Sequence, residues 1–169
     1  MAAIILEPVS TQSQIDTLCA IAKTVWHETY DDLLPPGQPD YMIEKFQSDH
    51  AVKEQMAREN YRYVLAKLGE AYVGFVGYAP RYQDQEEMYL SKAYILPQGR
   101  SQGVVGALFR LVEEETKKEG LSRVRLTVNK GNAHAKAVYE HYGYRTVEAV
   151  RSDIGGGYVM DDYVMVKEL

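Results

Sequence analysis

One stretch of the chain, from Met88 to Gly120, joins a strand pattern, a glycine-containing turn and a helix pattern in direct succession. Apolar residues dominate at strand length, Pro97 ends the strand, and the apolar residues after a polar turn recur at helical spacing. The first turn of a helix carries unpaired N–H groups and the positive end of the helix dipole, and Gly103 and Gly106 allow a close approach to them. The segment predicts a phosphate-binding loop with Arg100 as a nearby cation, or else an ordinary strand-to-helix turn.

Two common phosphate-binding loops do not match this segment. A P-loop would end in Gly-Lys-Ser/Thr, and a dinucleotide fingerprint would need G-x-G-x-x-G after an early strand. Residues 100–108 instead resemble the pyrophosphate-binding segment of the GNAT superfamily of acyl-CoA-dependent N-acetyltransferases, whose usual form is Arg/Gln-x-x-Gly-x-Gly/Ala. Val105 stands where the second small residue of that form is expected, and Gly106 follows one position later.

A second segment, residues 128–144, is similar to another GNAT pattern, Val-x-x-x-Asn-x-x-Ala-x-x-x-Tyr-x-x-x-Gly-Phe. Its asparagine, alanine, tyrosine and glycine are Asn132, Ala135, Tyr139 and Gly143, and a tyrosine replaces the final phenylalanine. Asn132 can cap a helix or bind the pantetheine arm of the cofactor, and Tyr139 lies about two turns later on the same helix face. Ala135 and Gly143 are interpreted as packing and capping residues.

Together, the two motifs imply transfer of the acetyl group of acetyl-CoA to a primary amine by direct attack in a ternary complex. The acidic chain and its aromatic N-terminal half favour a small cationic acceptor. Tyr139 would protonate the departing sulfur, coenzyme A would be the product, and no metal ion is implied. Scattered aromatic residues loosely resemble the branch that acetylates spermidine and spermine in bacteria. The implied cofactor-binding residues are Tyr94, Ile95, Leu96, Arg100, Ser101, Gln102, Gly103, Val104, Val105, Gly106, Asn132 and Tyr139, and the candidate acceptor-binding residues are Trp26, Tyr30, Tyr41 and Tyr89.

The resemblance and the hydrophobic patterns together predict one α/β domain over residues 1–169. We expect a mixed, largely antiparallel sheet of about seven strands, helices on both faces, and a splay between the strands at 88–96 and 123–128. The expected strands are Ala3–Glu7, Tyr61–Leu68, Ala71–Ala79, Met88–Leu96, Arg123–Val128, Tyr144–Arg151 and Tyr158–Lys167, and the expected helices are Thr11–Glu28, Tyr41–Phe46, Ala51–Asn60, Gly103–Glu119 and Asn132–Tyr142.

Composition bounds the remaining possibilities. At 169 residues and 46% hydrophobic content, the chain can bury one core, and no apolar run is long enough to span a bilayer. A net charge of -5 without a basic block argues against nucleic acid and mildly favours a cationic substrate. Asp161 and Asp162, between Tyr158 and Tyr163, could attract a polyamine, although such an acidic pair is more often solvated surface.

The single cysteine, Cys19, offers neither a disulfide framework nor a zinc-binding spacing, which favours a reducing, cytoplasmic location. The four histidines show no metal-ligand spacing either. His134 and His141 each lie two residues beyond a motif residue, so helical geometry predicts that they point away from the proposed site. The sequence leaves open whether the protein is a monomer or a homodimer.

The group that deprotonates the acceptor amine is not identified by the sequence. Many GNAT proteins carry a glutamate near the middle of the fourth strand, where this chain has Tyr89 and Ser91. Glu86 and Glu87 lie in the preceding turn, so a water relay to one of them and the absence of a dedicated base are both compatible with the sequence.

Two other functions stay open. One is an acyl-CoA-binding regulatory domain without turnover, which Val105 and the missing strand carboxylate favour and the intact Tyr139 disfavours. The other is acetylation of a protein N-terminus or lysine, which needs an open groove. The bulky aromatic residues of the N-terminal half argue mildly against such a groove.

Overall fold

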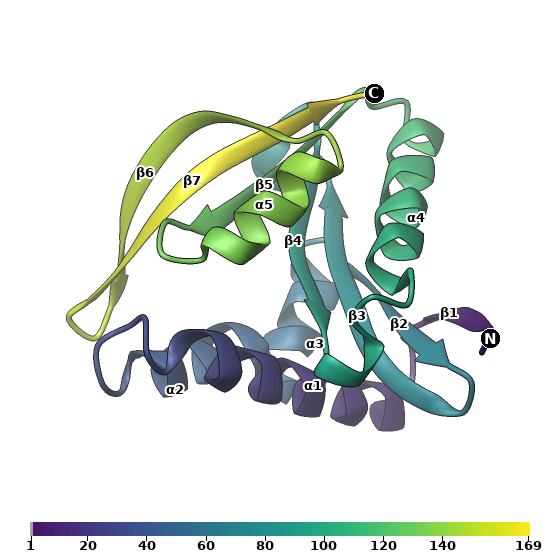
Figure 1. Ribbon diagram of the computed structural model, residues 1–169. Helices are drawn as coiled ribbons and strands as arrows, with labels where there is room; N and C mark the ends of the chain where they lie inside the picture. Colours follow the sequence, from purple (N-terminus) through teal and green to yellow (C-terminus); the bar gives the residue numbers. More distant parts are fainter. Residues whose placement is uncertain (1) are drawn as a thin grey trace.

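Seven strands pair in the order β1-β2-β3-β4-β5-β7-β6 in the computed structural model, which describes residues 2–169 (Figure 1). Neighbouring strands run antiparallel except β4 and β5, which run parallel. The predicted mixed, largely antiparallel sheet is therefore confirmed. The strands are β1 Ile4–Pro8, β2 Arg62–Leu68, β3 Ala71–Pro80, β4 Met88–Ile95, β5 Arg123–Asn129, β6 Arg145–Gly155 and β7 Tyr158–Glu168; the α-helices are α1 Gln12–Tyr30, α2 Gln38–Met42, α3 Asp49–Arg58, α4 Val104–Lys118 and α5 Ala133–His141.

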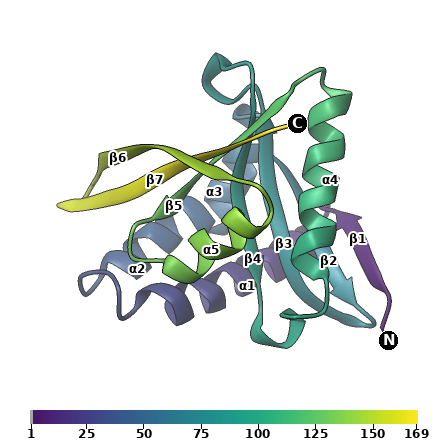
Figure 2. The same ribbon diagram turned by 45° about the horizontal axis from the view of Figure 1, so that its top comes forward.

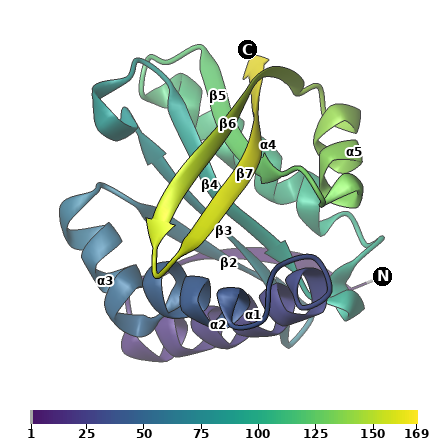
Figure 3. The same cartoon turned by 90° about the vertical axis from the view of Figure 1, so that its left-hand side faces the viewer.

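Helices cover both faces of the sheet, as predicted. Figure 2 shows α4 beside β2 and β3, whereas Figure 3 shows α1, α2 and α3 gathered on one side of the strands. The apolar residues of α1 pack with Leu65 and Phe75 in one core, and those of α4 pack with Val124 and Met165 in another. Among the helices of residues 2–169, none combines the length and the apolar composition that a bilayer crossing requires.

The parallel contact between β4 and β5 is short. The strands pair at Met88 with Val124 and at Tyr89 with Arg125, and they diverge beyond these two pairs. The remainder of β5 continues to pair with β7, as far as Asn129 opposite Asp162. The predicted splay therefore lies at the carboxyl ends of β4 and β5.

A β-bulge interrupts β4 at the start of the splay. Gly77 of β3 pairs with Lys92, whereas the next residue, Tyr78, pairs with Leu90, so Ser91 is an extra residue on β4. A bulge reverses the side on which the following side chains lie, and bulges are common beside functional sites.

The consequence is a change of face along β4. Met88 and Leu90 pack in the core under α4, and strict alternation would place Lys92 with them. Instead, Ser91 accepts a hydrogen bond from the Tyr61 hydroxyl (2.8 Å) and the Lys92 ammonium donates to Gln55 Oε1 (3.0 Å) of α3. Both side chains therefore face the α1 and α3 side.

The helix beginnings follow from local residues. Thr11 and Gln14 form the predicted capping box of α1, and Ser48 caps α3 through its side chain. The predicted helix Tyr41–Phe46 is wrong in detail. The chain instead forms α2 followed by a π-helical turn, Ile43–Gln47, which leaves the carbonyl of Phe46 free to accept from Lys92 (2.6 Å).

The β6–β7 hairpin is longer than predicted and reaches the helical layer. Strand β6 continues to Gly155 because three consecutive glycines, all with positive φ, turn the chain there. Near this tip, Gln38 of α2 donates to the carbonyl of Val159 (2.9 Å), and the Tyr41 hydroxyl donates to that of Ile154 (2.7 Å). Figure 3 shows the tip extending toward α2.

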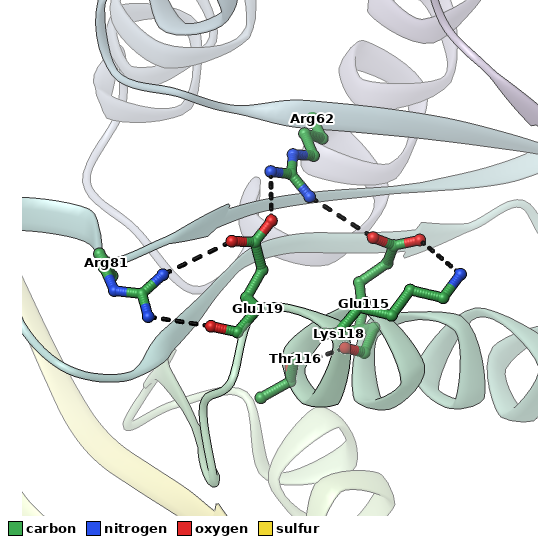
Figure 4. Close-up of polar contacts among 7 residues, drawn as sticks. Arg62, Arg81, Glu115, Thr116, Lys118 and Glu119 are labelled. Atoms are coloured by element: carbon green, nitrogen blue, oxygen red, sulfur yellow. Dashed lines mark hydrogen bonds and ion pairs between the residues drawn. The ribbon is translucent and has the colours of Figure 1, made fainter.

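Ion pairs hold the C-terminal end of α4 against the sheet (Figure 4). Arg62 of β2 contacts Glu115 (3.4 Å) and Glu119 (2.7 Å), and Arg81 contacts the Glu119 side chain (3.5 Å) and donates to its carbonyl (2.9 Å). Partly exposed pairs contribute about 0–1 kcal/mol each, so these contacts orient α4 more than they stabilise it.

Substitution of Gly77 tests the packing beneath the bulge. A Cβ atom on Gly77 would lie 2.5 Å from Cε1 of Tyr63, whose hydroxyl donates to Gln55. We expect Gly77→Ala to lower the free energy of unfolding by about 1–3 kcal/mol in chemical denaturation, because the ring has to move. Gly120→Asn is the control, since its φ of +74° suits asparagine and nothing lies within 4 Å. Equal stability of both variants would contradict the packing.

Candidate functional site

A cavity of about 1030 Å³ opens where β4 and β5 diverge. Its walls come from both strands, α1, the π-helical turn, α5 and the loop before α4. The two sequence motifs, although separated along the chain, therefore meet at one space. The predicted site residues that line it are Trp26, Tyr30, Tyr89, Tyr94, Ile95, Arg100, Ser101, Gly103, Val104, Val105, Asn132 and Tyr139.

Four predicted site residues lie outside this lining: Tyr41, Leu96, Gln102 and Gly106. The hydroxyl of Tyr41 holds the β6–β7 tip instead. A Cβ atom on Gly106 would lie 3.0 Å from the hydroxyl of Tyr142, so this glycine makes room for the packing of α5 on α4. Gly106 therefore packs against α5 and does not line the cavity.

The loop before α4 contains two residues with left-handed backbone conformation. Gly103 precedes the helix with a φ of +82°, and Ser101 also has a positive φ of 61°. A Cβ atom on Gly103 would meet nothing closer than Ile4 at 3.8 Å, so glycine is required by the backbone conformation rather than by space. The first-turn residues Val104 and Val105 line the cavity, which places the unpaired N–H groups of α4 at its edge.

Arg100 is engaged elsewhere. Its guanidinium forms an ion pair with Glu28 of α1, and both side chains are partly exposed. The pair links the loop to α1, so a phosphate group at the loop would meet an arginine already shared with a carboxylate. The backbone of the loop is thus the better candidate for holding an anion.

Asn132, the N-cap of α5, and Tyr139, about two turns later, both line the cavity. Asn132 caps α5 by accepting from the Ala135 N–H (3.2 Å), and its amide donates to the Tyr30 hydroxyl (3.3 Å). Tyr139 stacks on Phe109 (5.8 Å between ring centroids), and its hydroxyl has no hydrogen-bond partner among residues 2–169. Burial, assisted by Tyr30, raises the pKa of Tyr139, and the phenol is therefore protonated at neutral pH, as an ordinary tyrosine also is.

A phenol also organises the opposite wall. The Tyr94 hydroxyl of β4 accepts from the indole of Trp26 (2.8 Å) and from the amide of Gln47 (3.2 Å). Trp26 packs on Tyr30 with ring centroids 4.4 Å apart. Burial raises the pKa of Tyr94. The aromatic wall is therefore fixed by contacts among α1, the π-helical turn and β4.

Sequence inspection missed Lys92, which lies in the cavity wall with 4% of its surface exposed. Its ammonium donates to the carbonyl of Phe46 and to Gln55, and lies 5.1 Å from the centroid of the Tyr63 ring. Burial lowers the pKa of Lys92 to about 7. In the sequence, Lys92 stands out as a charged residue within an apolar strand. The face of the sheet on which its side chain lies, however, depends on the bulge at Ser91.

Two buried side-chain oxygens at the cavity lack hydrogen-bond donors within residues 2–169. They are Oε1 of Gln47, in the π-helical turn, and Oδ1 of Asp162, on β7. The expectation that Asp161 and Asp162 form solvated surface holds for Asp161, which pairs with Lys130 (3.1 Å), and fails for Asp162. His134 lines the cavity too, contrary to the direction predicted from helical spacing.

A family model identifies the chain. Residues 25–144, more than half of its length, match the acetyltransferase (GNAT) family. The chain belongs to this family. The matched range runs from α1 through both motifs to the end of α5, and so contains most of the cavity wall.

Curated relatives and solved structures agree with this assignment. Uncharacterized N-acetyltransferases of Mycobacterium bovis and Mycobacterium tuberculosis are each 36% identical over 95 residues, covering 56% of this chain and 60% of theirs. The PaiA N-acetyltransferase of Thermoplasma acidophilum, solved with coenzyme A, has a TM-score of 0.79 at 19% identity over 99% of both chains. A GNAT acetyltransferase of Elizabethkingia anophelis, solved with acetyl-CoA, has a TM-score of 0.65 at 14% identity over 98% of both chains. The sequence identities of 19% and 14% with these two solved structures show a shared fold.

The buried position of Lys92 predicts a pH-dependent stability. An unfolded lysine has a pKa of about 10.4, so between about pH 7 and pH 10 the unfolded chain holds a proton that folded Lys92 lacks. Stability should therefore rise with pH in this range, by at most about 1.4 kcal/mol per pH unit, and this contribution should be flat below it.

Denaturant titrations at pH 7.5 to 9 measure the slope. We expect Lys92→Met to lose it, whereas Lys23→Met, which removes an exposed lysine of α1, keeps it. Identical slopes in the wild type and in Lys92→Met would show that Lys92 is charged in the folded protein.

Proposed function

We propose that this protein transfers the acetyl group of acetyl-CoA to the primary amine of a small cationic acceptor, and that residues 1–169 act as one domain. The observation that carries the proposal is the position of Tyr139. Tyr139 lines a cavity bounded by the α4 loop and by aromatic side chains of α1, and its hydroxyl has no hydrogen-bond partner within the described range 2–169. Family membership and the names of the mycobacterial relatives support acetyl transfer.

The loop before α4 fits the pyrophosphate of the cofactor. Gly103 supplies the left-handed conformation, and the N–H groups at the start of α4 supply donors without a bulky side chain between them. The exposed edge of β4 at Tyr94 and Ile95 borders the same cavity and is the proposed contact for the pantetheine arm. When bound, acetyl-CoA supplies a thioester as acyl donor.

The chain's own residues have three tasks in the reaction. The α4 loop and β4 orient the acyl donor, and the aromatic residues Trp26, Tyr30 and Tyr89 bound the space for the acceptor. Tyr139 delivers the proton that the departing sulfur needs. The phenol carries this proton at neutral pH, because even an ordinary tyrosine has a pKa of about 10.

The preferred acceptor class is an aliphatic amine with several N–H groups, such as a polyamine. The two buried oxygens without donors, on Gln47 and Asp162, favour an acceptor that brings hydrogen-bond donors into the cavity. The contact between the β6–β7 tip and α2 covers one side of this space and disfavours a long peptide acceptor. A binding domain without turnover would not need the free Tyr139 hydroxyl.

An acceptor screen tests the proposal directly. Release of free thiol from acetyl-CoA is measured with diamines and polyamines, neutral amines, amino acids and short peptides. We expect turnover with the aliphatic di- and polyamines and little with amino acids, whose carboxylate would meet the buried Asp162. Acetyl-CoA binding by calorimetry without turnover on any amine would instead support the binding-domain alternative.

Removing the Tyr139 hydroxyl tests its role as the proton donor. We expect Tyr139→Phe to lower kcat by up to about 10²–10⁴-fold, because general acid catalysis typically contributes this much. A thiol has a pKa of about 8.5 and leaves tolerably without help, so the lower end of that range is expected. Acetyl-CoA affinity should change little, since the ring still packs on Phe109.

Tyr144→Phe is the matched control. Tyr144 belongs to the same aromatic cluster on Phe109 but does not line the cavity. It should keep the wild-type kcat. A normal kcat in Tyr139→Phe, or an equal loss in both variants, would contradict the proton-donor role.

A further inference from the structure

Asp162 is a carboxylate in an unusual setting. It lies on β7 with 5% of its surface exposed, and its Oδ1 has no hydrogen-bond donor among residues 2–169. The nearby cation, Lys130, pairs with the adjacent Asp161 at 3.1 Å and not with Asp162. An unpaired buried carboxylate is costly, so its position calls for a partner that the folded chain does not itself provide.

The cavity is where such a partner would come from, because Asp162 lines it. Asp162 is paired across the strands with Asn129, the last residue of β5, which lies at the open end of the splay and also lines the cavity. The side chain of Asp162 is thus held by the sheet, with β6 on its other side through Val150. A group on a rigid strand is well placed to position a reacting atom.

Tyr30 connects Asp162 to the proposed proton donor. Its hydroxyl accepts a hydrogen bond from Asn132, and the charge of Asp162 helps to raise the pKa of Tyr30. Tyr30 in turn contributes to the raised pKa of Tyr139. The carboxylate and the two phenols therefore line one cavity and influence one another's charge states, and the proposed function assigns the acyl group and the amine to this cavity.

We infer that Asp162 binds the ammonium of the acceptor and accepts its proton, and so is the base that the fourth strand of this chain lacks. The inference rests on the proposed function and adds to it the residue that activates the amine. It also explains why an amine is favoured, since an ammonium group satisfies both the charge and the empty hydrogen-bonding position of the carboxylate.

The ammonium gives one proton to Asp162, and the neutral nitrogen forms its bond to the carbonyl carbon of the thioester as the carbon–sulfur bond breaks. The nitrogen loses a second proton when the amide forms. Tyr139 supplies the proton that ends on the thiol and regains one of the two, and the other is released to solvent. No oxidant or metal is required.

Burial and the charged groups around Asp162 determine the pKa of its carboxyl. Burial and the charge of Asp161 raise the pKa of Asp162 to about 6, and Lys130 opposes this shift. The carboxyl is therefore ionised, and able to accept a proton, above about pH 6. An aspartate in an unfolded chain has a pKa of about 3.9. Between this pH and about pH 6, the folded chain holds a proton on Asp162 that the unfolded chain lacks, so stability falls as the pH rises.

The test compares Asp162→Asn with Asp161→Asn. The pH profile of kcat/KM, the melting temperature and the acetyl-CoA affinity are measured for each. For the wild type we expect kcat/KM to fall below about pH 6. For Asp162→Asn we expect a loss of about 10²–10⁴-fold at neutral pH, no acid limb and unchanged acetyl-CoA affinity.

Stability separates a functional from a structural role. Asp162→Asn should melt at a higher temperature than the wild type, by about 2–4 °C, because an unpaired buried charge is removed. Asp161→Asn should keep the rate and shift the acid limb to lower pH, since it removes a negative neighbour of Asp162. Asp162→Glu keeps a carboxylate and should recover part of the activity and the acid limb.

Distinct outcomes overturn the inference. A normal rate and pH profile in Asp162→Asn would exclude Asp162 as the base and leave the proposed function standing. Activity loss together with a lower melting temperature would indicate a structural role. An acid limb that disappears in Lys92→Met but persists in Asp162→Asn would assign the base to Lys92. Absence of turnover with every amine in the wild type would overturn the proposed function itself.

Discussion

The candidate site depends on how briefly β4 and β5 remain together. Two residue pairs join these parallel strands, after which β5 follows β7 and β4 follows β3. The divergence leaves backbone and side chains of both strands facing a common space, into which the start of α4 and one face of α5 also project. A sheet with continuous pairing at this point would have no cavity, because its interstrand hydrogen bonds would close the gap.

The bulge at Ser91 decides which side chains face that space. By adding one residue to β4, it turns Ser91 and Lys92 toward α1 and α3, while Leu90 and Ala93 remain on the α4 side. Lys92 then meets the carbonyl of Phe46, which the π-helical turn leaves free. The β-bulge in β4 and the π-helical turn are thus joined by this hydrogen bond, which links the helical layer to the sheet.

Several polar groups of the cavity are held in states that favour chemistry over stability. Burial raises the pKa of the phenols of Tyr94 and Tyr139, and burial lowers the pKa of Lys92 to about 7. Asp162 and Gln47 each keep an oxygen without a donor in the described chain. Such groups are destabilising in an ordinary core, and their concentration at one cavity is the usual mark of a functional site.

The sequence by itself determined the strand, loop and helix order, the capping box of α1, the parallel crossover and both motifs, because these follow from local periodicity and from residues with restricted backbone preferences. It also indicated which residues of the two motifs share a site. It could not place Lys92, whose direction depends on a bulge, or Tyr41, whose partner is a hairpin tip distant in sequence. Nor could it separate buried Asp162 from exposed Asp161, since adjacent strand residues differ only in the face that tertiary packing assigns to each. Burial and unsatisfied hydrogen bonding are properties of the assembled sheet, and only the tertiary structure decided them.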